Sequence, residues 1–162
     1  MSKLFKDLLS VGLFVGVVAM VPVLTTSGVT LNFVMMALFA CLIAQAWNVL
    51  GGFGGQFSFG HALFFGTGAY FQAIAQISWG WNPWLALPCA MLAAGLVGAW
   101  VGALSFRYGL KGSYFALITL AFAEVFRIVS LSVPFTGAGV GLMLPLKESW
   151  ANMQFGSRAG FV

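Results

Sequence analysis

From Leu8 to Phe106 the chain contains no aspartate, glutamate, lysine or arginine. Soluble domains carry about a quarter charged residues, and they do not expose apolar surface on this scale. The whole chain is 61% hydrophobic and 6% charged, and its mean hydropathy is +1.01. The composition therefore predicts an integral membrane protein that lipid surrounds.

Five apolar runs approach the length of about 20 residues that a helix needs to cross the hydrocarbon layer. Charged residues, Pro, Asn or clusters of Gly bound these runs. Their expected limits are 8–24, 29–50, 62–79, 84–106 and 113–133. The sequence thus predicts an all-α fold, a polytopic transmembrane helix bundle of about five spans. We expect residues 1–162 to form a single membrane-embedded domain.

Two pairs of basic residues predict the orientation of the bundle. Lys3 and Lys6 precede the first run, and Arg107 and Lys111 follow the fourth. Basic loops are cytoplasmic, so the amino terminus is expected inside and the tryptophan-rich turn at 79–84 outside. The basic residues are scattered rather than gathered with aromatics, which indicates lipid headgroups and not nucleic acid as their partner.

A cleavable signal peptide is the alternative for the first run, because lysines followed by an apolar core resemble such a peptide. The run is long, Pro22 interrupts its end, and no clear small-x-small cleavage site follows. A retained span is therefore favoured.

The chemical groups of the chain argue against an enzyme. His61 is its one histidine and there are three acids, too few for a Ser/His/Asp, Cys/His or metal-spaced cluster. The glycines of 51–55 lead into Gln56, not into the Lys-Ser/Thr of an ATP-binding loop. Cys41 and Cys89 lie inside apolar runs, where cysteine is a small hydrophobe. We expect no catalytic residue, no metal and no cofactor.

The segment 51–61 lies between the second and third runs and carries five glycines. Such glycine density breaks a helix, and freed backbone at membrane depth must be covered by protein or line a wet cavity. The helix that restarts after it directs amide groups at that cavity, where a carboxylate fits. Gly55 and the rest of this broken segment are therefore expected to border a translocation path. The alternative is a tight cytoplasmic turn in which His61 caps a helix or bonds a carbonyl.

The fifth run contains Glu124 and Arg127, which share one helical face and can form an ion pair. Ionised groups at membrane depth are costly unless they are paired or wet. One interpretation is that the pair gates or stabilises a translocation path. The other is a self-neutralising pair that locks this helix to its neighbours.

Three stretches carry a resemblance to a known family. Residues 48–62 read Asn-Val-Leu-Gly-Gly-Phe-Gly-Gly-Gln-Phe-Ser-Phe-Gly-His-Ala. This run resembles the Leu-Gly-x-x-Gly-Gln-x-Ser-x-Gly-His-Ala signature of LivM-type branched-chain amino acid ABC transporter permeases. Residues 110–124 are similar to the family's Gly-x-Tyr-Phe-Ala-x-x-Thr-Leu-Ala-Phe-x-Glu run, and residues 136–142 resemble its Thr-Gly-Gly-x-x-Gly-Leu loop. In that loop Ala138 replaces the second glycine.

The resemblance implies a permease subunit of an importer in the cytoplasmic (inner) membrane. Its partners are then a second permease subunit, two cytoplasmic ATPase subunits that hydrolyse ATP, and a periplasmic or lipid-anchored binding protein. By the same resemblance the candidates for the translocation path are Gln56, Ser58, His61, Thr119 and Glu124. Family members are considerably longer, so we expect the chain to be truncated before its C-terminal part.

The substrates implied are branched-chain amino acids or similar small polar solutes. Urea and amide importers share the signature, so they remain an alternative. A secondary transporter would need ion-coupling carboxylates, and the scarcity of acids disfavours it. A membrane assembly subunit that transports nothing is the last alternative.

Overall fold

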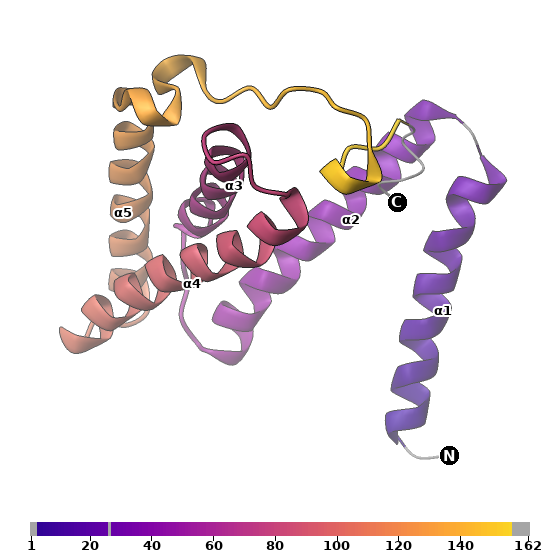
Figure 1. Ribbon diagram of the computed structural model, residues 1–162. Coiled ribbons are helices and arrows are strands. Elements are labelled where there is room, and N and C mark those ends of the chain that lie inside the picture. Colours follow the sequence, from indigo (N-terminus) through magenta and orange to yellow (C-terminus); the bar gives the residue numbers. More distant parts are fainter. Residues whose placement is uncertain (1–2, 26, 157–162) are drawn as a thin grey trace. The chain divides into compact units, whose positions relative to one another are not determined.

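The computed structural model describes residues 3–25 and 27–156, and in this part of the chain the regular elements are helices (Figure 1). The α-helices are α1 Lys3–Leu24, α2 Gly28–Asn48, α3 His61–Ile77, α4 Pro83–Arg107 and α5 Ser113–Ser132. Each coincides with one of the predicted apolar runs, so the all-α prediction is confirmed. Contacts divide the chain into two units, Ala44–Gln154 and Met1–Ile43 with Phe155–Val162.

Three helical stretches of the described chain are long and apolar enough to cross a membrane. They are Gly28–Phe53, Pro83–Arg107 and Ser113–Ser132, with mean hydropathies of 2.0, 1.8 and 1.8. The apolar stretch of α1, Leu8–Leu24, is shorter, and α3 has 17 residues. These lengths fit a multi-pass membrane protein.

The first unit contains α1 and most of α2, and their described side chains are mainly exposed. Leu13 is 71% exposed and Phe33 is 74% exposed, whereas Leu31 is buried. Helices that are apolar on all sides need lipid or other membrane helices around them. The side chains of Lys3 and Lys6, on which the cytoplasmic amino terminus was predicted, lie outside the part that the structure describes.

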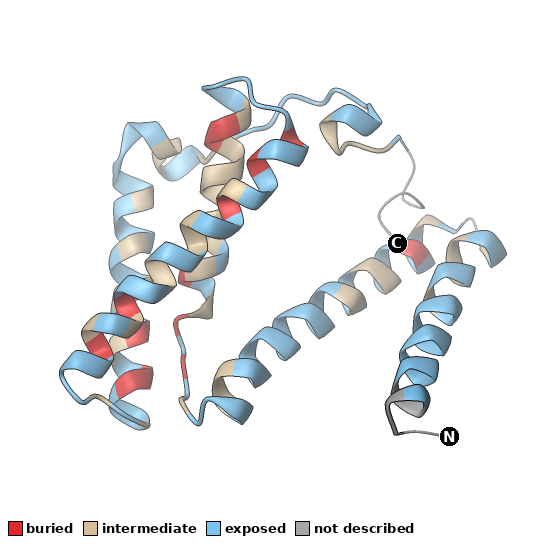
Figure 2. Ribbon diagram, turned by 60° about the horizontal axis from the view of Figure 1, so that its bottom comes forward, coloured by how far each residue is buried: buried red, intermediate tan, exposed pale blue. Residues whose placement is uncertain are grey.

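The second unit is built around α3, α4 and α5, and Figure 2 shows buried residues in all three. Small residues let α3 and α4 approach closely. A Cβ atom at Gly68 would lie 3.7 Å from the Cβ of Ala94, and one at Gly98 would lie 3.7 Å from the ring of Phe64. Close backbone approach of this kind is typical of helix pairs in membranes.

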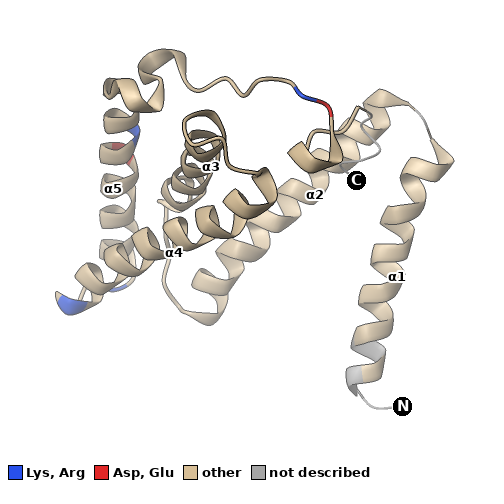
Figure 3. Cartoon of the chain, in the orientation of Figure 1, with Lys and Arg blue, Asp and Glu red and all other residues tan. Residues whose placement is uncertain are grey.

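Helix α4 runs between two chemically different ends of this unit. At its start the side-chain oxygen of Asn82 accepts a hydrogen bond of 2.9 Å from the backbone N–H of Trp84, a standard N-cap. We call the end of the unit where α4 begins the tryptophan end, and we define it by Trp79, Trp81 and Trp84. We call the opposite end, where α4 ends and the chain turns into α5, the basic end, and we define it by Arg107 and Lys111. Figure 3 shows basic positions at that turn and charged positions part-way along α5.

A loop with short 3-10 helices follows α5, at Pro134–Thr136, Ala138–Val140 and Trp150–Asn152. Ala138 has a φ of 47°, in the left-handed region that disfavours residues with a Cβ atom. This is the position where the sequence departs from the family's glycine. The loop returns to α4, because the indole N–H of Trp84 donates a hydrogen bond of 2.9 Å to the carbonyl of Trp150.

Candidate functional site

The helix break begins later than the glycine density predicts. After Asn48, α2 continues as a π-helix over Val49–Phe53, and the N–H of Gly54 donates to the carbonyl of Val49 at 3.1 Å. The helix break was predicted to start at Gly51, and this start is wrong, because helical structure continues to Phe53. Glycine weakens a helix by only about 1 kcal/mol, and the widened turn still satisfies the backbone. Helical structure ends where Gly55 takes a φ of +62°, which glycine adopts without strain.

Residues 54–60, which we call the glycine segment, lie along the first half of α5. The side-chain oxygen of Gln56 accepts a hydrogen bond of 3.1 Å from the N–H of Gly112, at the N-terminus of α5. The N–H of Phe59 donates a bond of 3.3 Å to the hydroxyl of Thr119. Thr119 lies about two turns further along α5, so the segment advances about 10 Å parallel to this helix. Helix α3 therefore starts deeper in the unit than α5 does, which explains why α3 is short.

The glycine segment touches α5 most closely at Gly60, the N-cap of α3. A Cβ atom there would come within 2.7 Å of the carbonyl carbon of Thr119 and closer still to its oxygen. Only glycine fits between these two backbones. The buried hydroxyl of Ser58 accepts a bond of 3.2 Å from the N–H of Gly60, and the Ser58 carbonyl accepts one of 3.2 Å from the indole of Trp47.

Three of the predicted path residues thus bond to backbone groups: Ser58 and Thr119 to N–H groups of the glycine segment, and Gln56 to the N–H of Gly112 on α5. Ser58 is 2% exposed and Thr119 is 0% exposed, and the Thr119 hydroxyl also donates to the carbonyl of Ala116 at 2.8 Å. Thr119 and Gln56 hold the glycine segment on α5, whereas the Ser58 hydroxyl bonds within the segment. That these residues line or shape a translocation path stays a prediction.

His61 and Gly55 make fewer contacts than the other candidates. The ring of His61 meets the ring of Phe64 edge to face at 6.2 Å. Its buried Nδ1 atom has no hydrogen-bond partner among the described residues. Nothing lies within 4 Å of a Cβ atom placed on Gly55, so backbone conformation alone requires glycine there.

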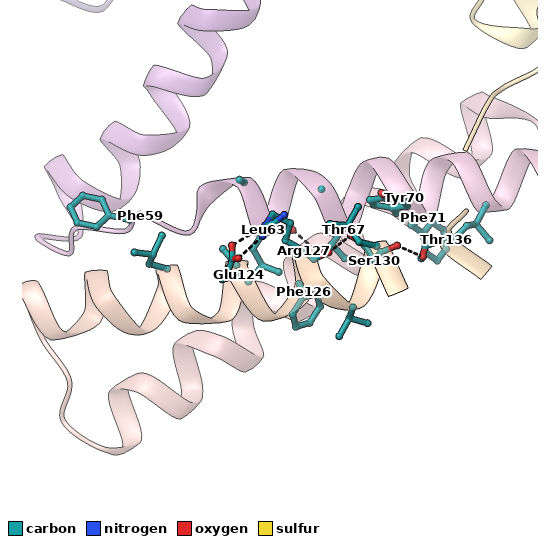
Figure 4. Close-up of a pocket in the computed structure, with 17 residues that line it drawn as sticks. Phe59, Leu63, Thr67, Tyr70, Phe71, Glu124, Phe126, Arg127, Ser130 and Thr136 are labelled. Atoms are coloured by element: carbon teal, nitrogen blue, oxygen red, sulfur yellow. Dashed lines mark hydrogen bonds and ion pairs between the residues drawn. The ribbon is translucent and has the colours of Figure 1, made fainter. Parts of the chain in front are cut away.

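A cavity of about 660 Å³ lies between α3 and α5. Figure 4 shows Phe59 at one end and Thr136 at the other, with Glu124 and Arg127 between them. The first end is the glycine segment, where Gly60 and Thr119 are in contact. The cavity therefore has a floor made by the helix break.

The sequence analysis expected a wet cavity at the helix break but did not identify the walls that α3 and α5 give this one, although a signal for them was present. Its lining repeats the spacing i, i+4, i+7, i+11 on both helices, at Leu63, Thr67, Tyr70 and Ile74 of α3 and at Leu120, Glu124, Arg127 and Leu131 of α5. Such a spacing marks one helical face. Each stripe carries its polar residues in the middle and apolar residues at both ends.

Glu124 and Arg127 form a two-bond ion pair on the cavity wall. The Arg127 Nε atom lies 2.9 Å from Glu124 Oε2, and Nη2 lies 2.6 Å from Oε1. The side chains are 59% exposed for Arg127 and 52% exposed for Glu124. Half-exposed charges at this depth of a membrane helix need water, a polar solute or protein against them.

Groups that hold metals do not gather in the part of the chain that the structure describes. His, Cys, Asp and Glu side chains form no cluster of three or more within residues 3–25 and 27–156. The cavity therefore offers an ion pair, hydroxyls and apolar walls for binding a solute.

Comparisons with known proteins identify a family and relatives that the chain resembles. The family described as "Branched-chain amino acid transport system / permease component" matches residues 29–143. The chain is 30% identical over 159 residues to the high-affinity branched-chain amino acid transport system permease protein LivM of Escherichia coli K12, covering 98% of this chain and 36% of that protein. It is 28% identical over 135 residues to LivM of Salmonella typhimurium LT2, covering 83% of this chain and 31% of that protein.

No solved structure matches the chain significantly. The chain spans about a third of the length of the curated relatives it matches, 36% and 31%. The matched residues 29–143 contain the glycine segment, the cavity and the loop after α5. The chain therefore belongs to the family of branched-chain amino acid transport system permease components.

Proposed function

We propose that the chain is part of a permease subunit of an ATP-driven importer for branched-chain amino acids or similar small polar solutes. The names of the two relatives and of the family support this substrate class. In this proposal ATP hydrolysis takes place on two separate cytoplasmic subunits. A second permease subunit completes the path, and a soluble or lipid-anchored binding protein delivers the solute.

The observation that carries the proposal is the cavity with a broken helix as its floor. Phe59 lines the cavity, and its backbone N–H is bonded to Thr119 on α5. Non-helical backbone at membrane depth is tolerated where it lines a cavity or is covered by protein, as in the broken helices of transporters. A floor held by a few hydrogen bonds, such as that between Gln56 and Gly112, can open at modest free-energy cost.

The orientation of this path follows from its two ends. The basic end carries Arg107 and Lys111 and the opposite end carries tryptophans, so the positive-inside rule assigns the basic end to the cytoplasm. The glycine segment then closes the cavity on the cytoplasmic side, and the amino terminus is cytoplasmic as well. Alternating access consists in releasing the glycine segment from α5 while the opposite side closes.

Uptake of radiolabelled L-leucine tests this function. Cells that lack the gene for this chain should lose uptake, the restored gene should return it, and ATP depletion should abolish it. Excess valine or isoleucine should compete, whereas urea should not. Uptake that survives ATP depletion but fails without an ion gradient would point to a secondary transporter, and unchanged uptake without the chain would refute the proposal.

A further inference from the structure

The polar groups of the α3–α5 cavity are not equivalent. The hydroxyls of Thr67 and Ser130 donate to backbone carbonyls of their own helices, both at 2.8 Å, and that of Thr136 donates to the carbonyl of Ser130 at 2.6 Å. Glu124 and Arg127 instead contact each other and stay half exposed. The ion pair is therefore the strongest polar feature that faces the cavity.

The pair keeps unused hydrogen-bonding capacity. Its two bonds occupy the Nε and Nη2 atoms of Arg127 and one lone pair on each oxygen of Glu124. A guanidinium has five N–H donors, and each carboxylate oxygen has two acceptor sites. A second carboxylate can therefore bind Arg127 while an ammonium group binds Glu124, so that four charges alternate in sign.

The rest of the wall is suited to an aliphatic side chain. Leu63 and Ile74 on α3, and Leu120 and Phe126 on α5, line the cavity together with Phe71. A volume of about 660 Å³ falls within the range of about 300–1,000 Å³ that small-molecule sites occupy. Such sites combine mostly apolar walls with a few polar groups that fix the orientation of the ligand.

We propose that this cavity binds an amino acid zwitterion, with Arg127 holding its carboxylate, Glu124 holding its ammonium group and the apolar wall holding an aliphatic side chain. The inference rests on the proposed function and assigns the solute-contacting residues within it. The ion pair then selects for solutes that carry both charges, and the hydroxyls of the wall have a minor part. Two alternatives compete with this proposal. A lipid chain fills the cavity in the first, and in the second the ion pair only stabilises helix packing and binds no solute.

The experiment uses the complete transporter in membranes, with Cys41→Ala and Cys89→Ala, and Thr67→Cys as a reporter in the cavity. A membrane-impermeant thiol reagent should label the reporter, and L-leucine should slow the labelling. The amine 3-methylbutylamine lacks the carboxylate and 4-methylpentanoate lacks the ammonium group, so neither should protect at the same concentration. Leu146→Cys, on the loop and 91% exposed, is the control reporter and should be labelled equally with and without leucine.

Charge variants then test the two roles. Glu124→Gln and Arg127→Gln should each raise the leucine concentration that halves the labelling rate at least tenfold. The double variant Glu124→Arg with Arg127→Glu keeps an ion pair but reverses its direction. It should recover thermal stability without recovering leucine protection, whereas full recovery of protection would show a structural lock and overturn the inference.

Two further results would overturn the inference. One is a cavity reporter that is not labelled, because another occupant then fills the cavity, or one that is labelled without protection by leucine, because leucine then does not bind there. The other is protection by 3-methylbutylamine or 4-methylpentanoate equal to that by leucine. Both labelling results are distinguishable from failure of the proposed function. If the proposed function fails, cells without the chain import leucine normally.

Discussion

The side-chain oxygen of Gln56 accepts a hydrogen bond of 3.1 Å from the backbone N–H of Gly112, a residue 56 positions later in the chain. The bond joins the glycine-rich stretch before α3 to the start of α5, which are two of the three stretches that resemble the permease family. The first N–H groups of a helix have no acceptor within the helix. Gln56 therefore satisfies a group at the N-terminus of α5 and at the same time fixes the glycine segment against it.

Gln56→Ala should remove this acceptor and loosen the floor of the cavity. A hydrogen bond of this kind contributes about 1 kcal/mol, which corresponds to about a fivefold change in the equilibrium between attached and released segment. We expect leucine uptake to fall at least about fivefold, while the amount of protein inserted in the membrane stays the same. Uptake assays and membrane immunoblots measure the two quantities.

Two further variants define what the Gln56 result means. Gln56→Glu keeps an acceptor oxygen at a helix N-terminus, where negative charge is favourable, and it should retain uptake. Gln45→Ala removes an exposed glutamine of α2 and should leave uptake unchanged. Normal uptake in Gln56→Ala would contradict a role for this contact.

Helix positions were predictable from the apolar runs of the sequence and from the charged or helix-breaking residues that bound them. A stretch without charged residues from Leu8 to Phe106 can persist only in lipid, and helices of about 20 residues are the way to span it. The limits of α4 and α5 were accordingly predicted to within one residue, at Pro83–Arg107 and Ser113–Ser132. Asn82 and Pro83 at the start of α4 are a local N-terminal signal, so this boundary needed no tertiary information.

The roles of the site residues were less predictable, because they depend on contacts between distant segments. The sequence indicated that Ser58 and Thr119 matter, but not that both are buried and bonded to backbone groups of the break. The requirement for glycine at position 60 comes from the Thr119 backbone, which no local pattern reveals. The start of the break was misplaced because a π-turn, which depends on hydrogen bonding and not on propensity, keeps Gly51 and Gly52 helical.

Thr119→Val should destabilise the protein while keeping its shape. The Thr119 side chain is completely buried, and its hydroxyl is the acceptor for the N–H of Phe59. A buried donor left without an acceptor costs about 1–3 kcal/mol, so the Tm of the purified protein in detergent should fall. Thr67→Val is the matched control, because its hydroxyl only donates to its own helix, and it should be nearly neutral. A Tm loss in Thr67→Val equal to that in Thr119→Val would contradict this account.

Ala138→Gly should stabilise the loop after α5. Ala138 has a φ of 47°, and a left-handed conformation costs an L-residue about 1–2 kcal/mol. Glycine removes this strain but adds backbone entropy to the unfolded chain, so the net gain should be about 0.5–1 kcal/mol. Ala121→Gly, at an exposed position of α5, should instead destabilise by about 1 kcal/mol. Thermal unfolding in detergent shows whether each variant is more or less stable than the unchanged protein. A lower Tm for Ala138→Gly would count against the strained conformation.

Gly60→Ala should be the most damaging small substitution in the glycine segment. The new Cβ atom would overlap the backbone carbonyl of Thr119, and backbone on both sides leaves no flexible side chain to move aside. Overpacking of this kind costs about 1–3 kcal/mol, and separating the segment from α5 would also break the bond between Phe59 and Thr119. We expect a clear drop in Tm together with loss of leucine uptake. Gly95→Ala is the control, since nothing lies within 4 Å of its Cβ position on α4 and alanine favours a helix; equal behaviour of the two variants would mean that the close approach of Gly60 to Thr119 does not exist.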